Sequence, residues 1–356
     1  MLGFLTIQLV LLALLLALLL VAYLGYVWVR YAPIIGRIFD ETPVFAPARV
    51  PPEPDGEEVR FLTPDGLELA GTYLPARTVD RAGVIVFCPE FLGDRWSALL
   101  YADGLREAGF DLFTFDFRNH GDSPSDAAYR PLQWVSDLEV LDLRAAVAYL
   151  KARPDADRAG LALFGMSRGG GAALCVGAAD PTVWAIATDG AFPTRGTMLA
   201  YILRWAEIYV RPLWLWRRMP GAIFRFASWF GRVSSQWRHG RRYPSLERAV
   251  ARIAPRPWLM IHGEKDVYIG PEIALELFSH ARQPKEAWIV PGAKHNRCRE
   301  TDPDSYRDRI VAFFRAQAPR RLVESQAVGP ADFPPAGVAC EGAAIGVAAS
   351  VTSVSG

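Results

Sequence analysis

A serine flanked by glycines, set between an apolar run and a run of small residues, constrains the fold of this chain more than any other feature. The apolar run Gly160–Phe164 precedes the motif Gly165–Gly169 (Gly-Met-Ser-Arg-Gly), and Gly170–Leu174 follows it. This order predicts a strand, a tight turn and a helix, with Ser167 at the apex of the turn. The serine must adopt strained backbone angles there, and side chains in place of the flanking glycines would collide with the neighbouring strand and helix. We therefore expect the Ser167 hydroxyl to project from a sheet, where it can attack a carbonyl.

A serine hydroxyl is a weak nucleophile at neutral pH and needs a base within hydrogen-bond reach. The chain has five histidines. His295 lies just past the apolar run Ala287–Val290, and ligands of open α/β sheets bind beyond the carboxyl ends of strands. His295 is therefore the predicted base. His120 and Asp122 lie on the loop after another predicted strand, and we interpret them as structural.

The base in turn needs a carboxylate that fixes its tautomer and stabilises its cation. Asp266 lies on the loop after the predicted strand Pro257–Ile261 and is the favoured acid. Asp189, which follows another predicted strand, is a second candidate. The chain order Ser167, Asp266, His295 matches the order expected for one fold class of serine hydrolases and differs from the orders of the others.

These motifs resemble those of the α/β-hydrolase superfamily. The resemblance covers residues 56 to about 318 and rests on the serine motif, on Asp116–Ser123, on His262–Asp266 and on Gly292–His295. The layout is also similar to the membrane-tethered serine hydrolases of the Bem46-like group.

The resemblance implies a fold and a set of roles. The fold would be α/β, a mostly parallel sheet with helices on both faces and a helical lid insertion, preceded by one transmembrane helix. Ser167 would be the nucleophile, Asp266 the orienting acid and His295 the base. No cofactor and no metal would be needed, and the spacing of the four cysteines suggests neither a disulfide framework nor a metal site.

The predicted oxyanion hole is where this chain departs from many relatives, which carry His-Gly at this position. Here the sequence after the predicted strand Gly83–Phe87 reads Cys-Pro-Glu-Phe-Leu-Gly-Asp. The resemblance implies the backbone N–H groups of Arg168 and of Phe91, or else Leu92, as the two donors. Glu90 would disfavour a developing oxyanion unless its side chain points away.

The amino-terminal segment predicts a membrane anchor. Met1–Val29 contains no charged side chain and is rich in leucine, and as a helix with a rise of ~1.5 Å per residue it exceeds the ~30 Å hydrocarbon core. A cleaved signal peptide is the alternative, with Ala46–Ala48 as its candidate cleavage sequence. Arg30 and Arg37 follow the segment, so the positive-inside rule predicts a single-pass protein with its catalytic domain on the cytoplasmic side.

Positive charge and tryptophan concentrate between Ala191 and Val250. This segment holds eleven arginines, two acidic residues and five of the eleven tryptophans. It falls between two predicted strands, where α/β-hydrolases insert lids, and helices are expected over Met198–Val210 and Gly221–Phe230. Such a lid would roof the pocket for a hydrophobic acyl substrate and suits contact with lipid headgroups; an ordinary packed lid with solvated arginines is the alternative. The whole chain carries 39 basic and 38 acidic residues, which argues against nucleic acid as a partner.

The remaining segments complete the predicted organisation. The opening hairpin is expected over Glu58–Leu62 and Leu67–Leu74, and further helices over Leu132–Lys151 and Ser305–Gln317. The predicted domains are a transmembrane anchor (1–30), an extended proline-rich stalk (31–55), the hydrolase domain (56–318) with its lid at about 191–250, and a disordered tail (319–356).

Together these features predict a membrane-anchored serine hydrolase. It would cleave a carboxylic ester or thioester of a small-molecule or lipid-like acyl substrate through an acyl-enzyme. A serine peptidase of the same fold is one alternative, which an acidic cluster placed to bind a free substrate amine would favour; none is evident in the sequence. A catalytically inactive binding or scaffold protein is the other, and the intact set of three separated residues argues against it.

Overall fold

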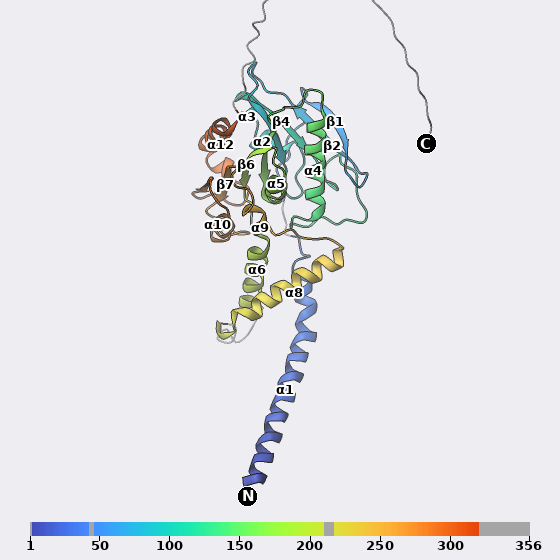
Figure 1. Cartoon of the computed structure of the whole chain (residues 1–356), viewed down its shortest axis with the longest axis vertical. Coiled ribbons are helices and arrows are strands. Elements are labelled where there is room, and N and C mark those ends of the chain that lie inside the picture. The colour runs from blue at the N-terminus through green and yellow to red at the C-terminus, as the bar shows by residue number, and fades with distance from the viewer. Residues whose placement is uncertain (1, 43–45, 210–216, 320–356) are drawn as a thin grey trace, which may run out of the picture. The chain divides into compact units, whose positions relative to one another are not determined.

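The computed structural model describes residues 2–42, 46–209 and 217–319. Within these residues one eight-stranded sheet has the order β1-β2-β4-β3-β5-β6-β7-β8, and Figure 1 shows helices packed around this sheet. The first hairpin and the pair β2–β4 are antiparallel, and all other neighbours are parallel. The strands are β1 (Glu57–Leu62), β2 (Glu68–Leu74), β3 (Gly83–Cys88), β4 (Phe110–Phe115), β5 (Leu161–Met166), β6 (Val183–Asp189), β7 (Trp258–Gly263) and β8 (Lys285–Val290). The predicted mostly parallel sheet is confirmed.

Helices cover both faces of this sheet. Buried side chains of α4, α5 and α10 pack against one face, and those of α2, α3 and α12 pack against the other. The helices are α1 (Leu2–Arg37), α2 (Ser97–Tyr101), α3 (Gly104–Glu107), α4 (Asp137–Ala152), α5 (Ser167–Ala179), α6 (Thr194–Tyr209), α8 (Gly221–His239), α9 (Leu246–Val250), α10 (Pro271–His280), α11 (Cys298–Thr301) and α12 (Pro303–Gln317). This is the predicted layered α/β architecture.

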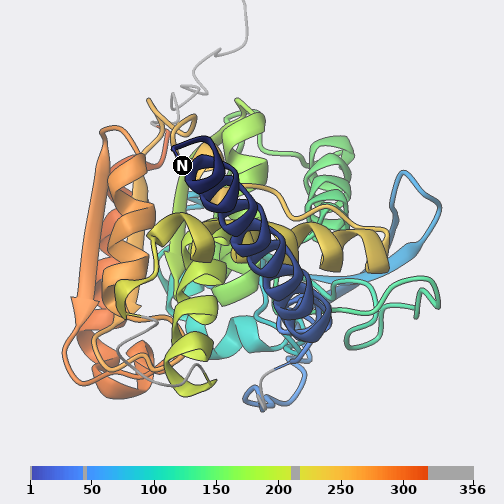
Figure 2. The ribbon, with the colours of Figure 1, turned by 90° about the horizontal axis from the view of Figure 1, so that it is seen from below.

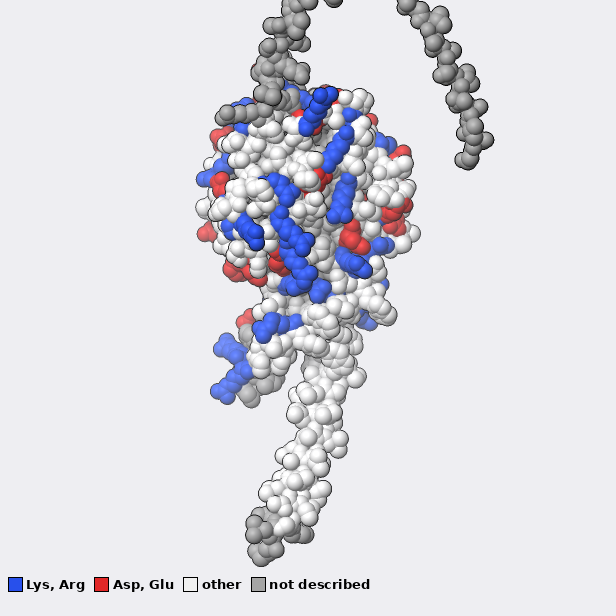
Figure 3. Space-filling model, viewed as in Figure 1, with Lys and Arg blue, Asp and Glu red and all other residues white. Residues whose placement is uncertain are grey.

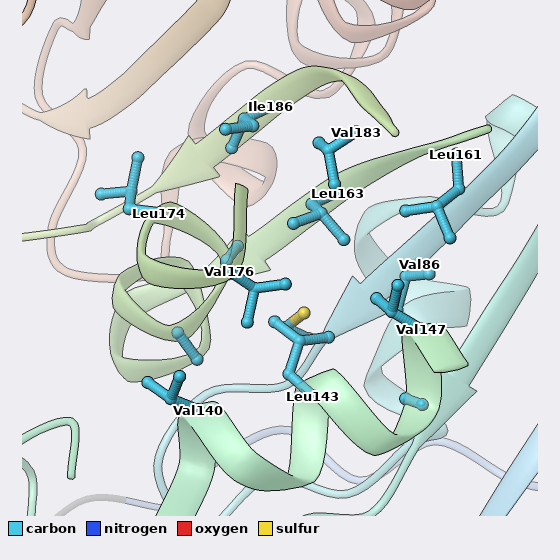
Figure 4. Packing of buried hydrophobic residues seen from close by; sticks show 14 of the residues in the cluster. Val86, Val140, Leu143, Val147, Leu161, Leu163, Leu174, Val176, Val183 and Ile186 are labelled. Carbon is cyan, nitrogen blue, oxygen red and sulfur yellow. The ribbon is translucent and has the colours of Figure 1, made fainter. Parts of the chain in front are cut away.

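The two central strands, β3 and β5, are apolar along their whole length because both of their faces are covered. Figure 4 shows one layer of this core, in which Leu143 of α4 and Val176 of α5 face Val86, Leu163 and Ile186 of the sheet. Each of these side chains is buried, and full burial of such a residue contributes roughly 1.5–3 kcal/mol. The packing fixes the position of β5 and α5, the two elements that meet at the serine motif.

Several predicted helix boundaries differ from those observed, and the start of α4 and the end of α8 differ most. Helix α4 begins at Asp137 and not at Leu132, because Ser136 caps it: the Ser136 hydroxyl accepts a hydrogen bond of 3.1 Å from the N–H of Leu138, and the Ser136 N–H donates to Glu139 at 2.8 Å. Helix α8 continues past the predicted end to His239, where Gly240 terminates it in the left-handed conformation.

The segment expected as an extended proline-rich stalk, residues 31–55, differs most from the prediction. Helix α1 continues to Arg37, and Phe39, two residues later, is completely buried. The indole N–H of Trp134 donates a hydrogen bond of 2.8 Å to the carbonyl of Phe39, and the two rings meet edge to face at 5.8 Å. The residues just after α1 therefore belong to a buried cluster of the domain, which Phe39 shares with Trp134 and with side chains of α6 and α8.

The rest of that segment also runs along the domain. Asp55 forms an ion pair of 2.8 Å with the buried Arg106, and Arg49 pairs with Asp94. Residues 46–53 form neither helix nor strand, and these contacts attach the segment to the surface of the domain, so it is not a separate spacer. Residues 43–45 and the predicted tail from residue 320 onward lie outside the described residues.

Helix α1 is the one helix in the described part of the chain that is long and apolar enough to cross a membrane. Its most apolar window of 18 residues has a mean hydropathy of 2.9 and is not buried in the protein, and Figure 3 shows no charged side chain along most of the helix. A signal sequence near the amino terminus has the same properties. Beyond this window, Trp28 packs on Phe226 and Phe230 of α8, with ring centroids 5.9 and 4.5 Å apart. Figures 1 and 2 show α6 and α8 on the side of the domain where α1 ends.

Candidate active site

The serine motif forms the strained turn predicted from its glycines. Strand β5 ends at Met166 and α5 begins at Ser167, whose φ of +47° lies in the left-handed region that side chains disfavour. A Cβ atom on Gly165 would lie 2.5 Å from the Cα of Gly170 in α5. A Cβ on Gly169 would lie 2.3 Å from the backbone carbonyl oxygens that follow β3. The sequence can make this turn only because both positions lack side chains.

The structure brings Ser167, His295 and Asp266 into one hydrogen-bonded chain. The Ser167 hydroxyl lies 2.9 Å from Nε2 of His295, and Nδ1 of His295 lies 2.5 Å from Oδ2 of Asp266. With the histidine proton on Nδ1, Nε2 is free to accept the hydroxyl proton. The three residues follow β5, β8 and β7, so they meet at the carboxyl edge of the parallel strands as expected.

Local contacts hold Asp266 ionised and oriented. Its Oδ1 accepts hydrogen bonds of 2.9 Å from the N–H groups of Tyr268 and Ile269, while Oδ2 faces His295. Burial alone would raise the pKa of this carboxyl, but the hydrogen bond and charge of His295 outweigh burial and lower it. His262, 3.4 Å away, is buried, and this burial lowers its pKa and favours its neutral form.

The second candidate acid occupies a different environment. Asp189, at the end of β6, accepts a hydrogen bond of 3.1 Å from the hydroxyl of Tyr306. Its carboxyl is fully buried, which raises its pKa to about 6. The structure therefore places Asp266, and not Asp189, on the ring of His295.

The loop that follows β3 lies directly against the serine turn. The carbonyl oxygens of Cys88 and Pro89 approach Gly169 closely, and Phe91, two residues further, is buried beside Ser167. Arg168 is in the first turn of α5, where backbone N–H groups have no carbonyl partner within the helix. Both predicted donor residues thus lie next to the serine.

Glu90 turns its side chain toward Ser97. The Ser97 hydroxyl lies 3.3 Å from Glu90 Oε2, and the carboxyl packs under Gly93, while Oε1 has no hydrogen-bond partner among the described residues. Burial raises the pKa of Glu90 to about 7. The carboxyl is therefore close to neutral below this pH, which reduces the conflict expected with an oxyanion.

A buried network behind the serine turn was not predicted from the sequence. The side chain of Arg168 is fully buried; it forms an ion pair of 3.3 Å with Glu139 and donates hydrogen bonds to Nε2 of His120 at 2.9 Å and to the carbonyl of Leu132 at 3.0 Å. Its guanidinium also lies 5.0 Å from the ring centre of Phe91. The residue whose N–H follows the serine therefore also supports the neighbouring loop, and His120 belongs to this support as a structural residue.

A narrow, largely aromatic cavity of about 40 Å³ opens at Ser167. Two of the residues that line it, Phe192 and Tyr201, come from the predicted lid between β6 and β7. The rest come from other loops, so in the described residues the insertion supplies part of the apolar wall and not most of it. The lining is Phe91, Gln133, Trp134, Ser167, Phe192, Tyr201, Tyr268, Ile269 and His295. Part of the insertion, residues 210–216, lies outside the described residues.

A family model and several known proteins resemble this chain in sequence. The model of the family described as "Alpha/beta hydrolase family" matches residues 85–309. The uncharacterized protein Rv2307c of Mycobacterium tuberculosis is 28% identical over 280 residues, which cover 77% of this chain and 82% of that protein. The uncharacterized protein YfhR of Escherichia coli is 26% identical over 270 residues, covering 74% of this chain and 82% of that protein.

Solved structures give the same result for the fold. The esterase Pf2001 of Pyrococcus furiosus superimposes with a TM-score of 0.56 at 18% identity, covering 78% of this chain and all of that one. The hypothetical protein PA2218 of Pseudomonas aeruginosa gives a TM-score of 0.54 at 23% identity, also covering 78% of this chain and all of that one. The more specific likeness to the Bem46-like group stays a prediction.

Proposed function

This chain belongs to the alpha/beta hydrolase family, and from that premise we propose that it is a serine hydrolase of carboxylic esters or thioesters. The observation that carries the proposal is the hydrogen-bonded chain from Ser167 through His295 to Asp266, which opens onto an apolar cavity. A hydroxyl, a neutral imidazole and an ionised carboxylate in this order are the parts that acyl transfer requires.

The proposed reaction follows from the positions of these groups. Nε2 of His295 takes the Ser167 proton as the hydroxyl attacks the substrate carbonyl, and Asp266 stabilises the imidazolium that forms. The backbone N–H groups of Phe91 and Arg168 hold the oxyanion. The imidazolium then protonates the leaving group, and a water activated by His295 releases the acid from the acyl-enzyme.

The lining of the cavity supports a hydrophobic acyl group as the preferred substrate part. Phe192, Tyr201 and Trp134 offer aromatic surface and few hydrogen-bonding groups. The cavity volume of about 40 Å³ accepts a short acyl chain as it stands. A long chain requires displacement of α6, which carries Tyr201, and we propose that the insertion between β6 and β7 acts as the lid that moves.

We further propose that α1 is an uncleaved membrane anchor. Its length and apolar surface support a single span. The burial of Phe39 just after the helix also favours an uncleaved chain, because cleavage after Ala48 would remove a core side chain from the hydrolase domain. Arg30 and Arg37 support a cytoplasmic catalytic domain.

An active-site probe tests the catalytic proposal. We expect a fluorophosphonate to label the full-length protein, and labelling to be lost in Ser167→Ala and in His295→Ala. Ser279→Ala, a change at an exposed position of α10, is the matched control and should label as the wild type does. Labelling that persists in Ser167→Ala refutes the nucleophile assignment, and no labelling of folded wild-type protein favours the inactive binding protein.

A series of p-nitrophenyl esters then tests the substrate. We expect hydrolysis of acetate and butyrate esters, with kcat/KM rising for longer chains only if the insertion opens. Activity confined to the shortest ester would restrict the substrate to small acyl groups.

A further inference from the structure

A second cavity, separate from the one at Ser167, lies between α6, α8 and α10. Its volume is about 360 Å³. Three arginines line it, Arg195 from α6 and Arg225 and Arg232 from α8. The other lining groups that matter for binding are Ser228, Trp229 and one carboxylate, Glu276. The lining therefore carries an excess of positive charge.

None of the three guanidinium groups forms an ion pair within the part of the chain that the structure describes. Glu247, which contacts the backbone of Arg195, is already engaged: it accepts hydrogen bonds of 2.7 Å from the backbone N–H of Arg195 and from the hydroxyl of Ser245. Burial and the positive charge of Arg195 lower the pKa of Arg232. The cavity thus holds mutually repelling cations that an anion would neutralise.

The arrangement suits a phosphate group. Arg225 and Arg232 are seven residues apart and so lie on the same face of α8, and Arg195 approaches from the neighbouring helix. A guanidinium presents a planar fork of donors that matches phosphate oxygens. Trp229, half exposed beside them, offers an apolar wall for the part of a ligand that follows the phosphate.

The neighbouring contacts point to a lipid as the source of this phosphate. Trp28, at the end of the apolar stretch of α1, packs on Phe226 and Phe230 of α8. With α1 in a bilayer, α8 lies at the level of the headgroups. Helix α8 also exposes apolar side chains at helical spacing, namely Ile223, Phe226, Val233 and Trp237, which is typical of a helix in the membrane interface.

We propose that the cavity between α6, α8 and α10 binds the phosphate of an anionic phospholipid in the leaflet that α1 enters. The assignment of a lipid rests on α1 as a membrane span and is independent of the catalytic role of Ser167. The three arginines hold the phosphate oxygens, and the exposed side chains of α8 contact the acyl chains.

Binding of short-chain lipids to the full-length protein in a nonionic detergent tests this proposal. Isothermal titration calorimetry would compare dioctanoyl phosphatidylglycerol, dioctanoyl phosphatidylcholine and inorganic phosphate. The test variant is Arg225→Gln/Arg232→Gln. The matched control is Arg217→Gln/Arg218→Gln, which removes the same charge from exposed positions just before α8 that do not line the cavity. The single variant Arg225→Gln changes an exposed side chain and serves if the double variant does not fold, as judged by circular dichroism.

We expect phosphatidylglycerol to bind the wild type and the control equally, and the Kd to rise at least roughly tenfold in the cavity variant. Phosphatidylcholine should bind more weakly than phosphatidylglycerol. An equal loss of affinity for phosphatidylglycerol in the cavity variant and in the control would show general charge attraction and overturn the proposal. The absence of phosphatidylglycerol binding would also overturn the proposal. Inorganic phosphate that binds as tightly as the lipid would overturn it too, because the ligand would then be a free anion.

Discussion

Burial and hydrogen bonding together decide which acidic side chains near Ser167 are charged. Asp266 has an imidazole and two backbone N–H groups as partners, and its pKa is lowered despite burial. Glu90 has a single hydroxyl partner, and burial raises its pKa from 4.5 to about 7. Burial raises the pKa of both carboxyl groups, and only the partners of Asp266 outweigh it.

Replacement of Glu90 by glutamine should change the pH dependence of stability. A carboxyl whose folded pKa is raised stabilises the protein fully below its unfolded pKa and loses that contribution as pH rises from about 4.5 to about 7. Glu90→Gln removes this loss. Relative to wild type, the variant should therefore gain on the order of 3 kcal/mol of unfolding free energy between pH 4.5 and pH 8. Urea unfolding of both proteins across this range measures the difference, and a difference that is independent of pH contradicts the prediction.

Loss of the buried guanidinium of Arg168 should be severe. Arg168→Met leaves the carboxylate of Glu139 buried without its ion-pair partner, a change that typically costs about 3–5 kcal/mol. Arg144→Met, at an exposed position of α4, is the control and should cost less than ~0.5 kcal/mol. Denaturant unfolding measures both. Similar costs for the two variants would mean that the buried network contributes nothing.

The contacts of some residues could be predicted from the sequence, and those of others could not. Ser167, Asp266 and His295 each follow a recognisable strand, so their meeting at one sheet edge can be expected from chain order. The contacts of Arg168 with His120 and Glu139 join residues far apart in the chain. No local pattern distinguishes these buried charges from exposed ones, so the network becomes visible only in the folded structure.

At the scale of elements, the strands are the best predicted because each is a short apolar run bounded by turn residues. Helix ends are less accurate: the apolar spacing extends back to Leu132, but the cap at Ser136 starts the helix. The stalk was predicted from proline content alone. Burial of Phe39 depends on its contact with Trp134, and proline content carries no information about that contact.

The end of α1 should contribute to the stability of the hydrolase domain. Phe39→Ala removes a completely buried ring and should cost about 3–5 kcal/mol, whereas Phe226→Ala, half exposed on α8, should cost less. Thermal unfolding measures both. Among truncated chains, one that starts at Tyr31 keeps the contact with Trp134, and one that starts at Ala46 loses it. Equal stability of these two chains would contradict the prediction.

At the scale of the whole molecule, the proposed anchor and orientation are open to direct measurement. Alkaline carbonate should leave the full-length protein in the membrane pellet, and its release would refute an uncleaved span. Trypsin should cut after the exposed Arg217 and Arg218 in inside-out vesicles and not in intact cells. Cleavage in intact cells would place the domain on the outside and reverse the orientation predicted from Arg30 and Arg37.

The buried position of Phe39 limits how far the hydrolase domain can move away from α1. A free tether over residues 31–55 would let the domain sample solvent up to roughly 80 Å from the bilayer. Because Phe39 is buried in the domain two residues after α1 ends, almost no flexible chain separates the helix from the domain. With α1 as the proposed anchor, Ser167 would stay within a thin layer above one membrane, where lipid-embedded substrates have a high effective concentration. Soluble esters would reach it only after diffusing to that layer, so the position of the domain would itself select among substrates that the cavity accepts equally.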